Sequence, residues 1–264
     1  RWRHLRMADW NPALYRRFED ERTRPAQELL GRVPHPAPTR VVDLGCGPGN
    51  STELLVQRYP QARVTGLDSS EAMLASARTR LPGVDFVQGD IAQWVPDEAP
   101  DLIYANAALQ WVGGHEQLFP RLLRSLAPGG VLAVQMPDNR DEPTHRLMRE
   151  VAKLSPWREA IGDAERLRTD LFGIGTYYDW LAPHSNHVDV WHTVYQHVMP
   201  SAGAIVEWVR STGLRPFIDP LTEPLKASYL AEYEQRIDAA YAVRSDGSRL
   251  LAFPRMFLIA RRPS

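Results

Sequence analysis

The stretch RVVDLGCGPGN at residues 40–50 constrains the fold of this chain more than any other. A short apolar run leads into Gly45, Gly47 and Gly49, and a helical pattern follows over 51–59. Strand, glycine loop and helix in this order begin a βαβ unit, whose loop holds a ligand beside the helix N-terminus. A nicotinamide-cofactor loop has the spacing G-x-G-x-x-G, which these glycines do not have. The ligand therefore need not be a phosphate compound.

The alternation of strand and helix patterns continues along the chain. Besides 40–45, strands are expected at 62–68, 84–90, 101–106, 129–136, 188–199 and 256–262, and helices at 51–59, 69–81, 115–126, 143–154, 201–213 and 226–241. Two helices are expected before the first strand, the second beginning at Pro25, and the glycine- and aromatic-rich segment 171–181 is expected to be a loop. This alternation predicts an α/β fold: a Rossmann-like, seven-stranded and mostly parallel sheet with helices on both faces.

One structural domain with a small helical cap is the expected organisation. Residues 1–35 form N-terminal helices of the cap, and 36–136 form the ligand-binding core of the sheet. Residues 137–186 are expected to be an inserted cap or lid segment, and 187–264 to complete the sheet and its packing helices. The ligand is expected beyond the carboxyl ends of the strands, where open parallel sheets bind theirs.

Composition excludes several classes of function. A formal net charge of −1 over 264 residues and the lack of a basic run argue against nucleic-acid binding. No stretch of about 18 apolar residues is present, which argues against a membrane span. The one cysteine, Cys46, permits no internal disulfide, and no cluster has metal-ligand spacing. We expect a cytoplasmic protein with a small-molecule substrate, no metal and no obligatory protein partner.

Acidic residues at the strand ends indicate a nucleoside ligand. Asp68 ends the second strand about 20 residues beyond the glycines, where a carboxylate accepts hydrogen bonds from ribose hydroxyls. Asp90 and Ile91 at the third strand end suit an adenine amino group and ring. Asp43, directly before the glycine loop, would repel pyrophosphate and instead suits a cation such as the ammonium of a methionine moiety. The loop also lacks the Lys of a nucleoside-triphosphate site.

The sequence DLGCGPGN, with Asp68, the Gly-Asp pair at 89–90 and Asn106, resembles the motifs of class I S-adenosylmethionine-dependent methyltransferases. The resemblance implies a sheet whose last strand is antiparallel, with S-adenosyl-L-methionine as cofactor and S-adenosyl-L-homocysteine as product. The cofactor-binding residues that it implies are Asp43, Gly45, Gly47, Asn50, Asp68, Ser69, Met73, Asp90, Ile91 and Asn106.

Segments outside the cofactor motifs resemble one branch of this superfamily, the trans-aconitate 2-methyltransferases. They include YANAALQW at 104–111, VDVWHTVYQHVMP at 188–200 and EWVRSTGLRP at 207–216, and the likeness extends over most of residues 9–262. The resemblance implies carboxyl O-methylation of trans-aconitate to its monomethyl ester. A carboxyl group with a pKa near ~4 is already ionised at neutral pH, so no catalytic general base is expected.

The other carboxylates of such a substrate must be paired with hydrogen-bond donors, best with Arg. The candidate substrate-binding residues are Arg22, Arg24, Gln110, Trp111, His145, Tyr178 and Arg215, with Tyr177 as a second neutral donor from the lid. Since 31 of the residues are cationic, any single Arg can equally be a solvated surface group.

Three other functions are compatible with parts of this pattern. The first is a methyltransferase of the same fold that acts on another small acid or on a malonyl-acyl carrier, which would require a basic docking surface. The second is a non-catalytic, nucleoside-binding regulatory protein, which would bind the cofactor without turnover. The third, a nicotinamide oxidoreductase, is disfavoured by the glycine spacing.

Overall fold

The computed structural model describes residues 12–167, 171–210 and 212–264; the side chains of 12–19 and 22 are outside this description. The strands are β1 (Arg40–Leu44), β2 (Arg63–Asp68), β3 (Asp85–Gln88), β4 (Leu102–Asn106), β5 (Val131–Pro137), β6 (His187–Met199) and β7 (Arg249–Arg261). The α-helices are α1 (Pro12–Gly31), α2 (Asn50–Arg58), α3 (Glu71–Arg80), α4 (His115–Ser125), α5 (Pro143–Ala152), α6 (Arg158–Ile161), α7 (Ile174–Leu181), α8 (Ala202–Arg210), α9 (Arg215–Ile218) and α10 (Glu223–Ala240). Short 3₁₀ helices are η1 (Leu109–Trp111), η2 (Ala164–Arg166) and η3 (Ala182–His184).

The strands form one seven-stranded sheet in the order β3-β2-β1-β4-β5-β7-β6. β1 to β5 pair in parallel, while β7 runs antiparallel to both β5 and β6. The predicted Rossmann-like fold and its antiparallel last strand are therefore confirmed. The order reverses between β1 and β4, so the carboxyl ends of these two strands flank the crevice in which such sheets bind ligands.

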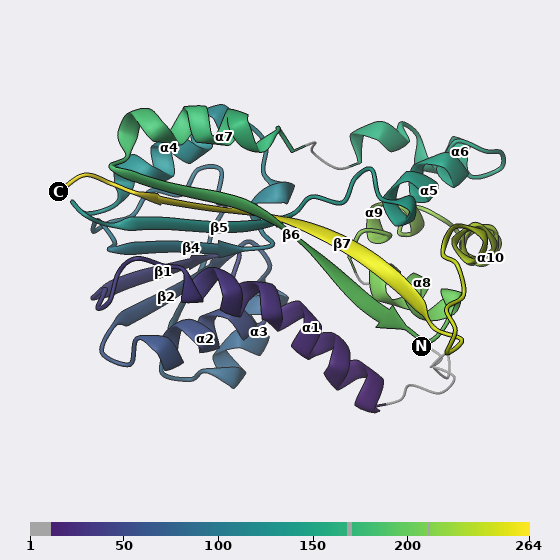
Figure 1. Cartoon of the computed structure of the whole chain (residues 1–264), viewed down its shortest axis with the longest axis horizontal. Coiled ribbons are helices and arrows are strands. Elements are labelled where there is room, and N and C mark those ends of the chain that lie inside the picture. Colours follow the sequence, from purple (N-terminus) through teal and green to yellow (C-terminus); the bar gives the residue numbers. More distant parts are fainter. Residues whose placement is uncertain (1–11, 168–170, 211) are drawn as a thin grey trace.

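Helices cover both faces of the sheet (Figure 1), with α1, α2 and α3 on one face and α4 and α7 on the other. On the first face, Leu29 and Leu30 of α1 join Tyr104, Phe257 and other strand residues in one apolar cluster. On the second face, α4 and α7 bury Phe119 and Leu181 among side chains from β4, β5 and β7. Both faces are thus shielded from water, as a parallel sheet requires.

A helical cap lies at one end of the sheet, where α5, α6, α8, α9 and α10 gather (Figure 1). The long hairpin of β6 and β7 extends from the sheet into this cap, and it brings Met199, Leu251 and Phe253 into the cap's own apolar core. Tyr229 and Tyr233 of α10 donate hydrogen bonds to carbonyls of α5, at 2.8 and 3.0 Å. The cap therefore has a core that is separate from the clusters on the sheet faces.

Several predicted elements differ from the observed ones. The two predicted N-terminal helices are one continuous helix, α1, with Pro25 inside it. Proline removes one hydrogen bond from a helix, and burial of Ala26, Leu29 and Leu30 in the turns that follow outweighs the loss. The predicted loop 171–181 contains helix α7, and β7 begins at Arg249 rather than at 256 because the hairpin with β6 continues into the cap.

Candidate active site

The glycine loop lies at the carboxyl end of β1 and is held by contacts that only glycine permits. Gly45 has a φ of +72°, and a Cβ there would lie 2.3 Å from the Cβ of Ala108. The backbone N–H groups of Gly45 and Cys46 donate to the Leu67 carbonyl of β2, at 2.7 and 3.0 Å. Gly47 has a φ of +53°, and nothing lies within 4 Å of its missing Cβ, so its backbone faces open space.

Asp43 is a fully buried carboxylate below this loop. Its Oδ2 accepts hydrogen bonds from the hydroxyls of Ser51 and Thr52, at 2.7 and 2.8 Å. Its Oδ1 is buried without a partner among the described residues. Burial raises the pKa of Asp43 to about 6, and the two hydroxyl hydrogen bonds limit the rise. A carboxylate with one unmatched oxygen is suited to a cationic group.

Helix α2 begins without a side-chain cap because its serine is used elsewhere. The N-cap of α2 is Gly49, with a φ of +94° and no side-chain hydrogen bond. The Ser51 hydroxyl is donated to Asp43 instead. In contrast, α3 has a side-chain cap, since Ser70 Oγ accepts from the Met73 N–H at 3.3 Å.

A pocket of about 430 Å³ opens beside the glycine loop. Its walls are the loop and the start of α2, the end of β4, and helix α1, with Gly45, Cys46, Gly47, Pro48, Asn50, Ser51, Leu54, Arg80, Asn106, Thr23 and Ala26 as lining residues. Pockets of 300–1,000 Å³ are typical of small-molecule sites. Four of the predicted cofactor residues, Gly45, Gly47, Asn50 and Asn106, therefore meet at one pocket.

The predicted adenosine-binding residues lie at the neighbouring strand ends and are not among the lining residues of this pocket. Asp68 is connected to the loop, because its Oδ2 accepts from the Gly47 N–H at 2.9 Å and its Oδ1 from the Ser70 N–H at 2.9 Å. Ser69 and Met73 follow at the surface, and Asp90 is exposed with its Oδ1 on the Ala92 N–H. Ile91 packs into the apolar cluster on the α4 face.

Cys46 is a buried loop residue. Burial, together with the nearby Asp43 and Asp68 carboxylates, raises the pKa of its thiol to about 12. The thiol is therefore protonated at neutral pH, which argues against a role as nucleophile.

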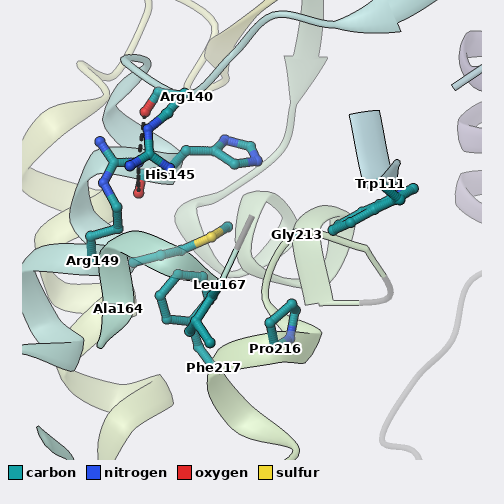
Figure 2. A pocket seen from close by; sticks show the side chains of 10 residues that line it. Trp111, Arg140, His145, Arg149, Ala164, Leu167, Gly213, Pro216 and Phe217 are labelled. Atoms are coloured by element: carbon teal, nitrogen blue, oxygen red, sulfur yellow. Dashed lines mark hydrogen bonds between the residues drawn. The ribbon is translucent and has the colours of Figure 1, made fainter. Parts of the chain in front are cut away.

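A second and much smaller pocket, of about 20 Å³, lies in the cap. It is lined by Trp111, Arg140, His145, Met148, Arg149, Ala164, Leu167, Gly213, Pro216 and Phe217. Figure 2 shows Arg140, Arg149 and His145 grouped on one side of it and Trp111 on the opposite side. Trp111 belongs to η1, which follows β4, whereas Arg140 follows β5. The carboxyl ends of two sheet strands thus supply part of the cap pocket.

Glu165 pairs with two arginines of the cap pocket and with Lys153. Glu165 Oε2 lies 2.7 Å from Arg140 Nη2 and 3.3 Å from Arg149 Nε, and its Oε1 lies 2.6 Å from Lys153 Nζ. The hydrogen-bonded ion pair with Lys153, followed by the charges of the two arginines, lowers the pKa of Glu165. Among the described residues, Glu165 thus brings the guanidinium groups of Arg140 and Arg149 together at one side of the pocket.

Three comparisons with known proteins agree with this geometry. Residues 41–130 match a family model described as a methyltransferase domain. The chain is 71% identical over 258 residues to a trans-aconitate 2-methyltransferase of Paracidovorax citrulli, covering 97% of this chain and 99% of that protein. The chain belongs to the trans-aconitate 2-methyltransferase family. A member from Yersinia pestis is 56% identical over 96% of this chain and 98% of that protein.

Solved structures show the same fold at low sequence identity. The YcgJ protein of Bacillus subtilis superimposes with a TM-score of 0.59 at 13% identity, covering 91% of this chain and 99% of that one. A phosphoethanolamine N-methyltransferase of Haemonchus contortus superimposes with a TM-score of 0.56 at 16% identity, covering 91% of this chain and 53% of that one. This member of the trans-aconitate 2-methyltransferase family is therefore a methyltransferase on a Rossmann-like sheet.

The structure separates the predicted substrate residues of this family member into two groups. Trp111 and His145 line the cap pocket, whereas Arg24 and Arg215 are 64% and 61% exposed at the side chain. Arg24 forms an ion pair with Glu28 at 2.8 Å, and Arg215 lies 3.5 Å from Asp219. The side chain of Arg22 is outside the described residues.

The remaining predicted substrate residues lie close to the strand ends or on α7, which packs on the sheet beside α4. Gln110 is buried, and its Nε2 donates to the Ala107 carbonyl at 2.8 Å, so it supports the turn after β4. Tyr178 of α7 is 46% exposed. Tyr177 is fully buried, and its hydroxyl lies 2.7 Å from His115 Nδ1. Because His115 Nε2 faces the Leu109 carbonyl at 2.8 Å and must donate there, Tyr177 is the donor to Nδ1 and has a structural partner.

Sequence reasoning missed Arg140 and Arg149, which the structure places at the cap pocket of this trans-aconitate 2-methyltransferase family member. Arg140 lies three residues beyond the end of β5, so the strand-end rule that selects Asp43, Asp68, Asp90 and Asn106 also points to it. Arg149 has no comparable signal, since it lies within α5.

The described part of the chain contains no group of His, Cys, Asp or Glu side chains arranged to hold a metal ion. Within the same ranges, none of the helices has both the length and the apolar character needed to cross a membrane. The cytoplasmic location and the absence of an obligatory protein partner stay predictions.

Proposed function

We propose that the chain is a carboxyl O-methyltransferase that converts trans-aconitate to its monomethyl ester, with S-adenosyl-L-methionine as the methyl donor and S-adenosyl-L-homocysteine as the second product. The observation that carries this proposal is the 71% identity, over 97% of the chain, to a protein named trans-aconitate 2-methyltransferase. The two pockets supply the physical reasons.

The pocket beside the glycine loop fits the methyl donor. The unpartnered Oδ1 of Asp43 suits the ammonium of the methionine moiety, and the open space at Gly47 allows a ligand to approach the backbone. Asp68 retains acceptor capacity for ribose hydroxyls, since each of its oxygens accepts one backbone hydrogen bond and a carboxylate oxygen can accept two. When bound, S-adenosyl-L-methionine supplies an electrophilic methyl group on a sulfonium centre.

The acceptor needs orientation rather than deprotonation. A carboxylic acid with a pKa near ~4 is ionised at neutral pH, so no side chain has to remove a proton. The protein's contribution is to hold the carboxylate oxygen against the methyl group, and such positioning can lower a barrier by roughly 7–11 kcal/mol. Asn106, at the end of β4, lines the first pocket and Trp111 of η1 lines the second, so one short stretch of chain joins the two.

The cap pocket offers partners for the carboxylates that do not react, and its volume of about 20 Å³ must widen to admit them. Arg140 and Arg149 provide guanidinium donors, and His145 lies beside them (Figure 2). Arginine forks pair with carboxylates bidentately, which favours a polycarboxylate over a monocarboxylate. In the structure Glu165 pairs with both arginines, so a substrate carboxylate would share or replace its contacts.

Transfer of a labelled methyl group tests the proposal. The purified protein is incubated with labelled S-adenosyl-L-methionine and a panel of trans-aconitate, cis-aconitate, isocitrate, citrate, a malonyl-acyl carrier and a phenol. Fast labelling of trans-aconitate, with the label lost on mild alkaline treatment, is the expected result. Labelling of another acceptor in its place would contradict the substrate, and cofactor binding without any transfer would contradict the activity.

A further inference from the structure

Asn106 lies at the end of the strand whose continuation, through η1, reaches the cap pocket. It is the last residue of β4, which pairs with β1 on one side and with β5 on the other. β1 leads to the glycine loop, and β5 leads to Arg140 of the cap pocket. Asn106 also lines the pocket beside the glycine loop. Asn106 is therefore placed between the strand that leads to the glycine loop and the strand that leads to Arg140.

A directed chain of hydrogen bonds fixes the orientation of the Asn106 amide. The guanidinium of Arg255 can only donate, and its Nη1 lies 3.0 Å from Oε1 of Gln135. Gln135 must therefore present its carbonyl to Arg255, which leaves its amide nitrogen to donate. Gln135 Nε2 donates to Oδ1 of Asn106 at 2.8 Å. The Asn106 amide nitrogen, Nδ2, is then the group that remains for the pocket.

Burial makes this orientation costly to reverse. Gln135 is fully buried and Arg255 is 6% exposed, so water does not replace a lost partner at either residue. If the Gln135 amide rotated by 180°, its NH₂ would face the guanidinium and its carbonyl would face Oδ1 of Asn106. Both contacts would then be repulsive. The hydrogen bonds are therefore donated in one direction, from Arg255 to Gln135 and from Gln135 to Asn106.

The backbone beside Asn106 is held from two sides. Ala107 has a φ of +53°, a left-handed conformation that is rare for a residue with a side chain. Its N–H donates to the Gln135 carbonyl at 2.9 Å, and its own carbonyl accepts from Gln110 Nε2 at 2.8 Å. Local strain of this kind persists only where the surroundings enforce it, and it is common at functional sites.

We infer that Asn106 donates a hydrogen bond through Nδ2 to the reacting carboxylate of the acceptor acid, and that Gln135 and Arg255 are positioning residues that make Asn106 a donor. This inference rests on the proposed function, because it names the residue that binds the reacting group. A neutral amide suits this task, since a direct Arg pair would reduce the nucleophilicity of the attacking oxygen. Arg255, two hydrogen bonds away, fixes which atom of the Asn106 amide faces the pocket.

Gln135→Glu tests the direction. The carboxylate that this variant places beside Arg255 is ionised and can only accept, so Asn106 must turn its NH₂ toward it and present Oδ1 to the pocket. We expect the KM for trans-aconitate to rise at least about tenfold, a loss of roughly 1.4 kcal/mol, with the Kd for S-adenosyl-L-methionine changed less than about twofold. The matched control is Gln196→Glu, the same change at an exposed position on β6, which should leave both constants unchanged.

Two further variants keep the inference falsifiable if the buried glutamate impairs folding. Asn106→Asp removes the donor without changing the buried Gln135, and it should also raise the KM for the acid. Arg255→Lys retains a group that only donates, so it should keep the KM within about threefold of the wild-type value. Thermal unfolding of each variant shows whether a change in KM accompanies a loss of stability.

Three outcomes would overturn the inference. One is an unchanged KM in a folded Gln135→Glu or Asn106→Asp variant. Another is weaker binding of S-adenosyl-L-methionine with an unchanged KM for the acid, which would assign Asn106 to the donor. A third is a KM in Arg255→Lys as high as in Gln135→Glu. If the wild-type protein transfers no methyl group to trans-aconitate, the proposed function fails instead, and calorimetric binding of the acid to wild type and Gln135→Glu then decides the inference.

Discussion

The two pockets are lined by different kinds of groups. The pocket beside the glycine loop consists mainly of backbone and short side chains, whose positions follow from the sheet and from glycine conformations. The cap pocket includes long, charged side chains from the segment after β5 and from α5, which pair with a carboxylate from η2. A site made of backbone is fixed once the fold forms, whereas a site made of Arg and Glu side chains can adjust to its ligand. The first suits an invariant methyl donor, and the second suits selection of the acceptor.

The largest expected loss of stability and of cofactor binding is at the pocket beside the glycine loop. In Gly45→Ala, the new Cβ would collide with Ala108 and the φ of +72° would be strained, so we expect a loss of about 2–4 kcal/mol in unfolding free energy. Cofactor binding should fall below detection, because the loop must move. Chemical denaturation and calorimetric titration measure the two effects. Gly83→Ala, in a loop with nothing within 4 Å of the Cβ position, is the control.

Substitutions in the cap pocket should change the KM for the acid rather than the stability of the protein. Arg140→Met removes one of the two guanidinium groups, and we expect the KM for trans-aconitate to rise about tenfold or more, in the range of a charge-assisted hydrogen bond. The Kd for S-adenosyl-L-methionine should not change. Arg158→Met, at a side chain that is 64% exposed, is the matched control. Equal losses in the two constants would show that the pockets do not divide the ligands as proposed.

The pH dependence of cofactor binding sharpens the comparison. Because the pKa of Asp43 is raised to about 6, the carboxylate is ionised above this pH and is protonated below it. Affinity for the cationic donor should therefore decrease as the pH falls from 7 to 5. The contribution of Asp43 to the stability of the free protein should change in the opposite direction. Because its pKa is raised on folding, the ionised carboxylate destabilises the fold, and it does so less as the pH falls toward the unfolded value near ~4.

Asp43→Asn checks this assignment. An amide carbonyl still accepts from Ser51 and Thr52, but it has no charge to titrate. We expect weaker binding of S-adenosyl-L-methionine at pH 7 and little further change between pH 7 and pH 5, measured by titration calorimetry. A variant with the same pH slope as the wild type would assign that slope to another group.

The smallest expected effect is on α7, where Tyr177 and Tyr178 distinguish a packing role from a binding role. Tyr177→Phe removes the donor to His115 Nδ1 and should lower the unfolding free energy by about 1–2 kcal/mol. The KM for trans-aconitate should stay within about twofold, because the Tyr177 hydroxyl faces a buried histidine. Tyr178→Phe, at the exposed neighbour, should leave stability unchanged. A large rise in KM for Tyr177→Phe would show that Tyr177 contributes to substrate binding.

The same contrast explains how much the sequence predicts. The alternation of elements, the glycine loop and the strand-end residues follow from local patterns, because a parallel sheet places all its carboxyl ends at one edge. Asp43, Gly45, Gly47, Asn50 and Asn106 can therefore be selected from the amino-acid sequence alone.

The cap is harder to predict because its contacts are tertiary. With 31 cationic residues in the chain, sequence alone does not distinguish Arg140, which lines a pocket, from Arg24, which pairs with Glu28 on the surface. The hydrogen bonds that connect Arg255, Gln135 and Asn106 join β7, β5 and β4, and no local sequence pattern indicates them. Pro25 is similarly misleading, since packing of α1 on the sheet decides whether one helix or two form.

The central claim is tested most directly by the rate of methyl transfer from labelled S-adenosyl-L-methionine to trans-aconitate, measured against cis-aconitate, isocitrate and citrate under the same conditions. The account predicts that trans-aconitate gives the highest kcat/KM and an alkali-labile product. A protein that binds the donor but labels none of these acids, or that labels another acceptor faster, would contradict it.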